Sequence, residues 1–324
     1  MVIGKVPENV LKRSILNRIR SKRSEVLVGA DVGVDCAVLS FKDSEYFYSS
    51  VNTKSLPVKD NASLSLCAAI NSVAAAGAEP ISAEVSVVLP EGTEEKSVKS
   101  IYETLDALAA KLQVQISGCH TEVSNAVTRP VVTVTGIGKS DERFSNTAKP
   151  GDDIVVTKWI GLEGTNIIAH ELEDRLLKKF PQKMIYDAEN FDKYLSVCGE
   201  AATAVKSGVS AMYAAGEGGI FNALWKLAQG SGVGLEVDMM KLPVKQETIE
   251  ISNFCDINPY ELASMGCLVI AASDGNELVM RLKEQGINAV TVGKITDSND
   301  RVVINRETRR FLEPSGNEEI YKIF

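Results

Sequence analysis

The sequence has few of the residues that build soft metal centres or redox centres. It contains only two histidines, His120 and His170, and its six cysteines are dispersed without any Cys-x-x-Cys pair. Two histidines are too few for a multi-histidine metal site, and unpaired cysteines argue against a zinc ribbon or a redox dithiol. We therefore expect most of the cysteines to be reduced core residues.

Long hydrophobic runs and a signal peptide are also missing. No stretch of about 18 consecutive apolar residues occurs. The opening residues MVIGKVPENV do not place a charged segment before an apolar one. These features predict a cytoplasmic protein without membrane association.

Positive charge is scarce as well. The 324 residues include 35 Lys and Arg against 43 Asp and Glu, which gives a net charge of -8. Nucleic-acid binding needs clustered basic residues, so we do not expect a nucleic-acid partner. One basic stretch, residues 12–23, alternates Lys and Arg with apolar residues such as Ile15 and Ile19. This pattern favours the solvated face of a short amphipathic helix over a nucleic-acid patch.

The length and the 44% share of hydrophobic residues fit two compact domains. The first half reads as short strands rich in β-branched residues, interrupted by two helices. The strands are expected at 25–29, 36–41, 46–51, 83–89, 131–138 and 153–157, and the helices at 62–76 and after Thr93.

The pattern changes to longer helices near residue 149, where we place the domain boundary between 1–148 and 149–324. Helices are expected at 164–172, 187–206, 220–229 and 276–285, and strands at 267–272 and 289–295. This order predicts a sheet covered on one side by helices.

Two segments of the first half combine glycines or small residues with polar groups. Residues 29–38 contain Asp31 and Asp35 in a glycine loop, where carboxylates can hold Mg²⁺ that bridges nucleotide phosphates. By itself, this segment fits better a turn in which Asp caps backbone amides. Residues 70–80 form a small-residue helix that ends at a glycine turn, which indicates tight helix packing.

Two further segments could bind an anion. Residues 118–123 bring His120, Thr121 and Glu122 into what we expect to be one turn, either to bind phosphate or ribose hydroxyls or to satisfy a buried turn. Residues 216–220 place glycines at the start of a helix, where backbone N–H groups and the helix dipole favour an anion. Paired glycines also begin helices that bind nothing.

Taken together, the segments resemble the AIR synthase-like superfamily, which contains AIR synthase, selenophosphate synthetase, thiamine-monophosphate kinase and the HypE hydrogenase-maturation factors. The HypE-like members are the most similar. The resemblance is carried by INSVAAAGAEP (70–80), GCHTEV (118–123), KPGDDIVVTKWIGLEGT (149–165), GEGGIFNALWKLAQGSGVGLEV (216–237) and INPYELASMG (257–266).

The resemblance implies a PurM-like two-domain α/β (α+β) architecture, with an N-terminal β-barrel-like dimerisation domain and a C-terminal α/β domain. It also implies a homodimer, a possible maturation-protein partner, and ATP with Mg²⁺ in the cleft between the domains. The chemistry it implies is phosphate transfer or displacement at ATP, which activates an oxygen as a leaving group.

Site residues follow from the motif positions. Asp35, with Asp31, is the metal-ligand candidate, and Asn71 matches the Asn of the family's Asn-Asp pair, which continues here with Ser72. Asn52 stands where the family has an acid. The nucleotide-binding or phosphate-binding candidates are Asn52, Asn71, His120, Thr121, Glu217, Gly218 and Gly219.

Several family features are absent, and they leave the enzyme question open. Neutral residues at Asn52, Ser72 and Ala214 replace acids, and a charge pair about 4 Å apart is worth roughly 4 kcal/mol at an effective dielectric near 20. The last cysteine is Cys267, so the C-terminal cysteine of HypE is missing. Two alternatives to an ATP-dependent dehydration therefore stay open. They are a non-catalytic homodimeric scaffold or sensor (a pseudoenzyme) and, ranked lowest, phosphoribosylformylglycinamidine cyclo-ligase.

Overall fold

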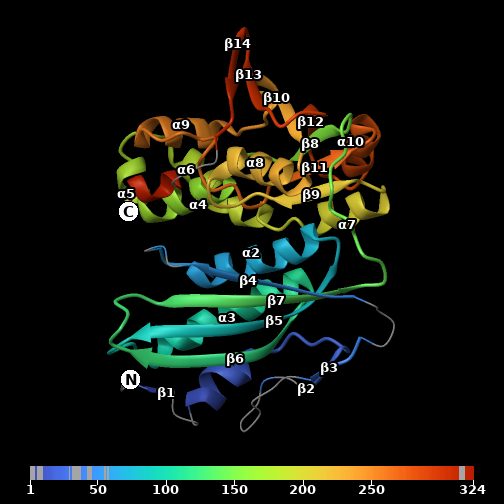
Figure 1. The fold of residues 1–324 in the computed structure, drawn as a ribbon. Coiled ribbons are helices and arrows are strands. Elements are labelled where there is room, and N and C mark those ends of the chain that lie inside the picture. Colours follow the sequence, from blue (N-terminus) through green and yellow to red (C-terminus); the bar gives the residue numbers. More distant parts are fainter. Residues whose placement is uncertain are drawn as a thin grey trace. The chain divides into compact units, whose positions relative to one another are not determined.

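The computed structural model describes residues 4–5, 10–28, 30, 38–41, 46–54, 56, 58–313 and 318–324. The chain divides into two compact units (Figure 1). Unit 1 comprises Met1–Ala74 and Ala78–Arg143, and unit 2 comprises Ala75–Gly77 and Phe144–Phe324.

Unit 1 is built on a five-stranded sheet in the order β1-β6-β5-β7-β4. Strands β5 and β6 are parallel and are joined through helix α3, whereas the other neighbours are antiparallel. Helices α2 and α3 lie on one face of this sheet (Figure 1). A separate two-stranded ladder pairs β2 with β3. The bounds are β1 (Gly4–Lys5), β2 (Val26–Val28), β3 (Val38–Leu39), β4 (Tyr46–Lys54), α2 (Asn61–Ala75), β5 (Glu79–Pro90), α3 (Glu95–Leu112), β6 (Gln115–Ser124) and β7 (Val131–Ser140).

The small residues of α2 allow the helix to approach the sheet closely. A Cβ added at Gly136 of β7 would lie 3.0 Å from the carbonyl oxygen of Ala69 and 3.3 Å from the side chain of Val73. The Ser65 hydroxyl donates to the Val132 carbonyl at 3.0 Å. The expected tight packing of this helix is therefore confirmed.

The basic stretch near the N-terminus forms a π-helical turn (Leu11–Ile15) and a 3-10 turn (Leu16–Arg18) in place of one regular helix. Ile15 and Ile19 are buried, as the amphipathic pattern predicted. Arg13 bonds to Glu95 and Arg18 to Glu103 of α3, so acidic partners neutralise these basic side chains.

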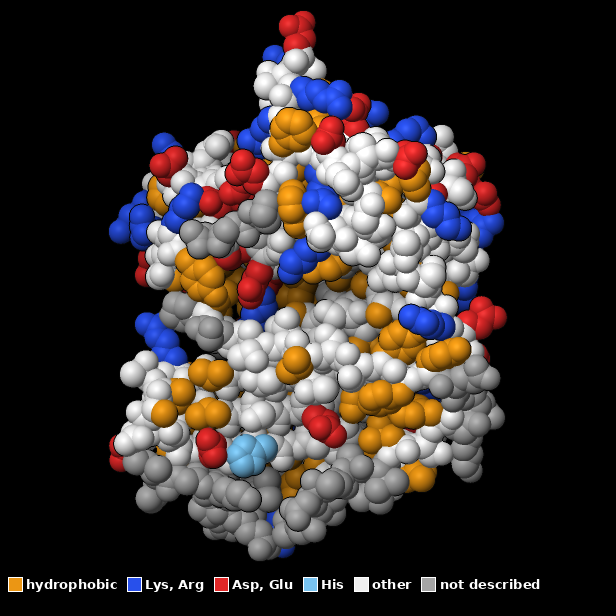
Figure 2. Space-filling model, viewed as in Figure 1, with side chains coloured by type: hydrophobic (Ala, Val, Ile, Leu, Met, Phe, Trp, Pro, Cys, Tyr) orange, Lys and Arg blue, Asp and Glu red, His pale blue; other side chains and the backbone are white. Residues whose placement is uncertain are grey.

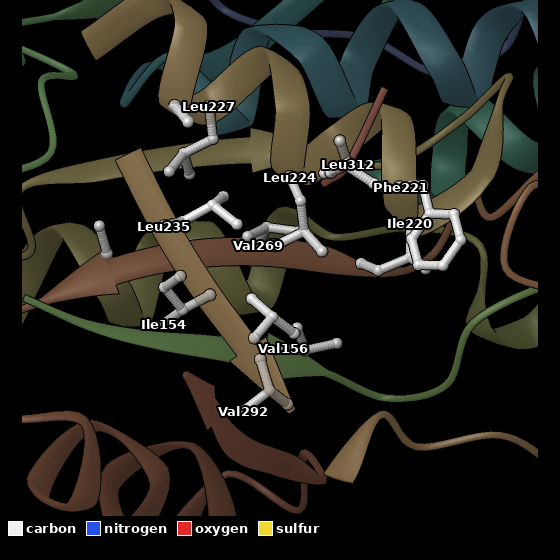
Figure 3. Packing of buried hydrophobic residues seen from close by; sticks show 14 of the residues in the cluster. Ile154, Val156, Ile220, Phe221, Leu224, Leu227, Leu235, Val269, Val292 and Leu312 are labelled. Atoms are coloured by element: carbon white, nitrogen blue, oxygen red, sulfur yellow. The ribbon is translucent and has the colours of Figure 1, made fainter. Parts of the chain in front are cut away.

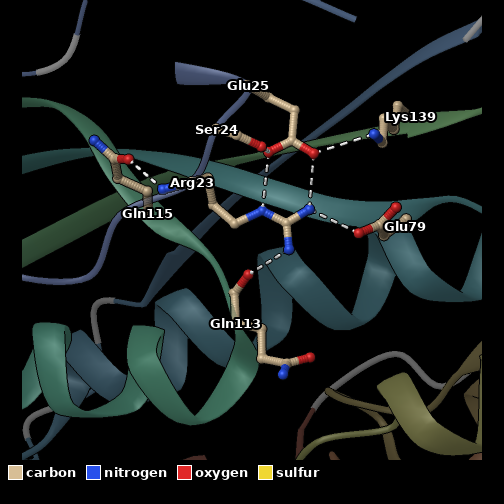
Figure 4. A network of polar contacts seen from close by, with 7 residues as sticks. All are labelled: Arg23, Ser24, Glu25, Glu79, Gln113, Gln115 and Lys139. Atoms are coloured by element: carbon tan, nitrogen blue, oxygen red, sulfur yellow. Dashed lines mark hydrogen bonds and ion pairs between the residues drawn. The ribbon is translucent and has the colours of Figure 1, made fainter. Parts of the chain in front are cut away.

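An ion-pair network ties the start of β2 to the main sheet (Figure 4). Arg23 lies 3.0 Å from Glu25 and 2.7 Å from Glu79, and Lys139 of β7 lies 3.1 Å from Glu25. Burial alone would raise the pKa of Glu25. Hydrogen bonds from its own backbone, Lys139 and Arg23 lower that pKa to about 2 instead.

Unit 2 is built on a seven-stranded sheet in the order β14-β13-β10-β12-β8-β11-β9. Only the β10–β13 pair is parallel among these described neighbours. The strands are β8 (Asp153–Thr157), β9 (Ala211–Ala214), β10 (Gly234–Asp238), β11 (Leu268–Ala272), β12 (Ala289–Thr296), β13 (Arg301–Asn305) and β14 (Thr308–Phe311). The helices are α4 (Leu162–Glu171), α5 (Glu173–Leu176), α6 (Gln182–Glu189), α7 (Cys198–Lys206), α8 (Gly219–Ser231), α9 (Gln246–Cys255) and α10 (Gly275–Glu284), with 3-10 turns η3 (Asn190–Tyr194), η4 (Met239–Lys241) and η5 (Glu319–Lys322).

Helices cover both faces of this sheet, so the expectation of one covered side was wrong. On one face, Leu224 and other apolar residues of α8 pack against Ile154 and Val156 of β8 (Figure 3). On the other face, Asp153 of β8 accepts a hydrogen bond from the backbone N–H of Gly275 in α10 at 3.0 Å. The interior strand β11, next to the edge strand β9, is buried along its whole length, as a strand between two helical layers must be.

The prediction of one continuous helix at 187–206 was also wrong. The chain forms α6, then η3, and then α7 from Cys198. The break lies at Leu195–Val197, where the Ser196 carbonyl accepts a hydrogen bond from the Lys158 side chain at 2.5 Å. No helix in the described part of the chain is long and apolar enough to cross a membrane.

Candidate functional site

Three of the motif segments meet in unit 2. The backbone N–H of Ser264 donates to the Gly216 carbonyl at 3.0 Å, and that of Phe221 donates to the Tyr260 carbonyl at 3.2 Å. The N–H of Gly164 donates to the Ala263 carbonyl at 2.9 Å. Segments 158–165, 216–221 and 257–266, which are far apart in sequence, therefore form one hydrogen-bonded site.

Glycines give the loop before α8 its shape. Gly218 and Gly219 both have left-handed backbone conformations, with φ of 75° and 66°. A Cβ at Gly219 would lie 2.4 Å from the Tyr260 carbonyl oxygen. Only glycine fits this close approach, which sets the N-terminus of α8 against segment 257–266.

A carboxylate from the C-terminal segment already binds one amide of this loop. One oxygen of Glu318 accepts from the backbone N–H of Gly218. The other oxygen accepts from the N–H of Ala263 at 2.7 Å and from that of Ile320 at 3.4 Å. Glu318 is only 6% exposed. The Gly218 N–H of this loop thus donates to an anion that belongs to the same chain, and phosphate binding at the loop stays a prediction.

A second buried acid lies close to Glu318. Glu163, in the first turn of α4, is fully buried and accepts a hydrogen bond from the Met265 N–H at 3.2 Å. Burial is the largest cause that raises the pKa of Glu318, and the charge of Glu163 adds to it. Despite the opposing N–H donors, this pKa is raised to about 7.

The next residue anchors the C-terminal segment at a different place. Glu319 accepts from the Asn258 N–H at 2.9 Å and from the Lys322 ammonium at 2.8 Å. Neither Glu318 nor Glu319 is among the residues predicted from the sequence. The signal available was two acids directly before the apolar IYKIF end.

Of the predicted residues, Glu217, Gly218 and Gly219 lie at this site. The Glu217 side chain is exposed, and its carbonyl accepts from the Asn222 side chain at 2.7 Å. The two glycines are buried.

His120 and Thr121 lie on opposite faces of β6, so the expected single turn was wrong. The alternation of a strand separates neighbouring side chains. Thr121 is buried under α3 and hydrogen-bonds to the Tyr102 hydroxyl at 2.8 Å. His120 is exposed on the other face, 3.3 Å from Glu122. The structure does not bring the His120 and Thr121 side chains, both predicted to bind phosphate or ribose, to one site.

The remaining predicted residues of unit 1 are amides and acids. Asn52 of β4 pairs with buried Val134, on the helix-covered face, and its Oδ1 is buried with no hydrogen-bond partner among the described residues. Asn71 of α2 is 1% exposed, with its Nδ2 3.6 Å from the Cys67 sulfur. Asp31 and Asp35 lie outside the described residues.

Within the described ranges, no group of three or more His, Cys, Asp and Glu side chains is placed to hold a metal ion. The two acids predicted to bind Mg²⁺ are not among these residues. The Mg²⁺ site stays a prediction.

Comparison with known proteins identifies the family. The AIR synthase related protein N-terminal domain matches residues 33–140, and the C-terminal domain of the same family matches residues 149–305. The chain belongs to the AIR synthase-related family. The PurM-like two-domain α/β architecture expected from the resemblance is confirmed by the two sheets and by the structural matches below.

Two relatives illustrate where the chain falls in this family. A hydrogenase expression/formation protein of Methanocaldococcus jannaschii is 25% identical over 313 residues, 93% of this chain and 91% of that protein. The carbamoyl dehydratase HypE of Rhodobacter capsulatus is 26% identical over 267 residues, 80% of this chain and 75% of that enzyme.

Solved structures agree on the fold. The E. coli hydrogenase maturation protein HypE matches with a TM-score of 0.82 and 18% identity, covering 98% of this chain and 100% of its own. HypE in complex with ATP matches with a TM-score of 0.79 and 17% identity, over 98% and 96%. A HypE–HypF complex matches with a TM-score of 0.69 and 22% identity, over 82% and 89%.

Proposed function

We propose that this AIR synthase-related protein is a HypE-like hydrogenase-maturation factor that binds ATP. The observation that carries the proposal is the match over 98% of the chain to a HypE structure solved with ATP. The sequence relatives, named for hydrogenase formation and carbamoyl dehydration, support the same assignment. They give no support to a non-catalytic scaffold or sensor.

The described residues fit the phosphate part of such a ligand. The N–H of Gly218 already binds a carboxylate, and phosphate oxygens use the same donors at a helix N-terminus. In unit 1, the buried Oδ1 of Asn52 lacks a hydrogen-bond partner among the described residues, so it is a candidate for a ligand contact. We assign phosphate contacts to Gly218 and Gly219, which follow Glu217 in the same loop, and a separate ligand contact to Asn52 of unit 1.

Magnesium would neutralise charge on the bound phosphates, and Asp35 with Asp31 are its proposed ligands. Asn52 and Ser72 offer neutral oxygens where the family has acids, and neutral dipoles bind a divalent ion more weakly than carboxylates do. We therefore expect Mg²⁺ to contribute less to ATP affinity than it would at a site with all its acids.

Residues 268–324 contain no cysteine, so this stretch offers no thiol as the group to be activated. We infer that the acceptor is a separate substrate or is carried by a maturation-protein partner. The solved HypE–HypF complex shows that a protein of this fold can form such an assembly.

The open face of the sheet in unit 1 favours a homodimer. Phe47 and Val51 of β4 point away from the helices and are 59% and 66% exposed. Figure 2 shows hydrophobic side chains spread over this sheet, with few charged ones between them. A face of this kind is typical of a protein interface.

Calorimetric titration with ATP, with and without Mg²⁺, followed by an assay of ADP release, tests the proposal. We expect binding in both conditions and ADP release with Mg²⁺. No ATP binding in either condition would contradict the proposed function. Binding without any turnover, alone or with candidate acceptors, would favour the scaffold.

An Asp35→Ala variant tests the metal assignment. It should lose the gain in ATP affinity that Mg²⁺ provides, because a carboxylate contributes far more than a neutral group to a divalent site. Asp297→Ala, at an exposed position of unit 2, is the matched control and should behave like the unmodified protein. An unchanged Mg²⁺ effect in Asp35→Ala would refute this ligand.

A further inference from the structure

We propose that Glu318 is a built-in competitor for the anion site at α8, so that the C-terminal segment 318–324 limits access of phosphate-bearing ligands to the Gly218 amide. The inference rests on the proposed function in one respect, that such ligands use this loop. It adds a form of regulation within the chain that the family match does not imply.

The contacts of Glu318 are those of a bound anion. Its two carboxylate oxygens bridge the N–H of Gly218 in the glycine loop and the N–H of Ala263 in segment 257–266. These donors come from two motif segments that also bond to each other, through Ser264 and Gly216 at 3.0 Å. Glu318 therefore occupies the position where the loop and the helix dipole favour negative charge.

The Gly218 N–H cannot bind Glu318 and a ligand at the same time. A backbone N–H makes one strong hydrogen bond, and the bond from Gly218 is already directed to Glu318. A phosphate group carries more negative charge than a carboxylate and offers more acceptor oxygens, so it can displace the carboxylate. The carboxylate has the advantage of a high effective concentration, because it belongs to the same chain.

The site disfavours the charge of its own occupant, which makes displacement feasible. The fully buried Glu163 of α4 accepts from the Met265 N–H of segment 257–266, the segment whose Ala263 N–H also binds Glu318. Glu318 is thus a second buried acid close to Glu163. In the rest of the segment Tyr321 and Lys322 are exposed, so release of the segment uncovers mainly Ile320, which is buried, and Ile323 and Phe324, which are half-buried.

Glu319 provides a matched control. It is buried like Glu318 and holds the same segment, but through the Asn258 N–H and the Lys322 ammonium, without contact to Gly218. Glu319→Gln weakens the docking of the segment in general. Glu318→Gln removes the charge at the loop while keeping the size of the side chain.

The experiment titrates ATP and inorganic pyrophosphate into the full-length protein, Glu318→Gln and Glu319→Gln by calorimetry at pH 8. Glu318→Ala is added as a second variant, and circular dichroism checks that each variant is folded. Loss of one charge-assisted competitor predicts about a tenfold gain in affinity for both probes in Glu318→Gln, and about twofold or less in Glu319→Gln. In the unmodified protein, saturating pyrophosphate should speed hydrogen exchange of the amides of residues 318–324.

The outcomes separate this inference from the proposed function. Equal ATP affinity in the unmodified protein and both Glu318 variants, or an equal gain in Glu319→Gln, overturns the competitor role and leaves ATP binding in place. Pyrophosphate binding that appears only in the Glu318 variants, with no ATP binding anywhere, supports the competitor and contradicts the proposed function. Binding of neither probe by any variant, or unchanged exchange of residues 318–324 at saturation, overturns the inference.

Discussion

At the scale of single residues, burial decides the properties of the acidic side chains at the candidate site. Glu318 and Glu163 have the same side chain as the exposed Glu217 a short distance away, yet only the first two are enclosed. Desolvation disfavours the charged form of Glu318, while backbone N–H donors favour it. For Glu318, burial outweighs the donors, and this balance makes the site sensitive to pH.

We predict that unit 2 loses stability as the pH rises from about 4.5 to 7. The pKa of Glu318 is about 7 in the folded protein against 4.5 for an ordinary glutamate, so the folded state holds a proton that the unfolded state releases. The stabilisation that the protonated Glu318 provides is complete below pH 4.5. Its loss lowers the free energy of unfolding by about 3 kcal/mol. Urea unfolding across this range should show the fall, and Glu318→Gln should remove it. A fall of the same size in that variant would mean that another group titrates.

The backbone of Gly219 gives a second prediction at this scale. Gly219→Ala should destabilise the protein by about 2 kcal/mol or more, because alanine must adopt a left-handed conformation and its Cβ meets the Tyr260 carbonyl. Gly230→Ala, in the same helix with open space around it, should stabilise by about 0.5–1 kcal/mol. Denaturant unfolding measures both, and equal effects would contradict the steric argument.

At the scale of elements, strong periodicity was a reliable guide and irregular connections were not. The strand expected at 153–157 agrees with β8, and the helix expected at 62–76 lies within one residue of α2 at either end. Segment 118–123 was misread because its glycine, histidine and threonine are typical of turns. It forms part of β6 because pairing with β5, which lies far from it in sequence, satisfies its backbone.

An ion-pair network joins β2 to the sheet and should make unit 1 sensitive to acid. The pKa of Glu25 is lowered to about 2, so its stabilising contribution is present above pH 4.5 and is lost as the pH falls toward 2, by about 3 kcal/mol. Lys139→Met should make the stability of unit 1 fall less steeply over this range and should cost about 1 kcal/mol at pH 7.

Lys96→Met is the control, because its pair with Glu94 is largely exposed and should change stability by less than about 0.5 kcal/mol. Acid titration followed by circular dichroism compares the two variants. A slope in Lys139→Met identical to that of the unmodified protein would exclude this role for the network.

At the scale of the whole molecule, the open sheet face of unit 1 predicts self-association. Val51→Glu should convert a dimer to a monomer, since a charge buried in an interface without a partner costs several kcal/mol. Tyr186→Glu, at a similarly exposed aromatic position of unit 2, should leave the assembly unchanged. Sedimentation velocity distinguishes the two, and a monomeric unmodified protein at all concentrations would refute the dimer.

The sequence by itself determined the family and the two-domain α/β class. These depend on local motifs and on periodicity, which a linear chain displays directly. Only the tertiary structure decided that His120 and Thr121 face opposite ways and that Glu318 accepts a hydrogen bond from the Gly218 N–H. Those facts depend on contacts between segments up to 100 residues apart, and no local pattern encodes which distant acid will meet which N–H.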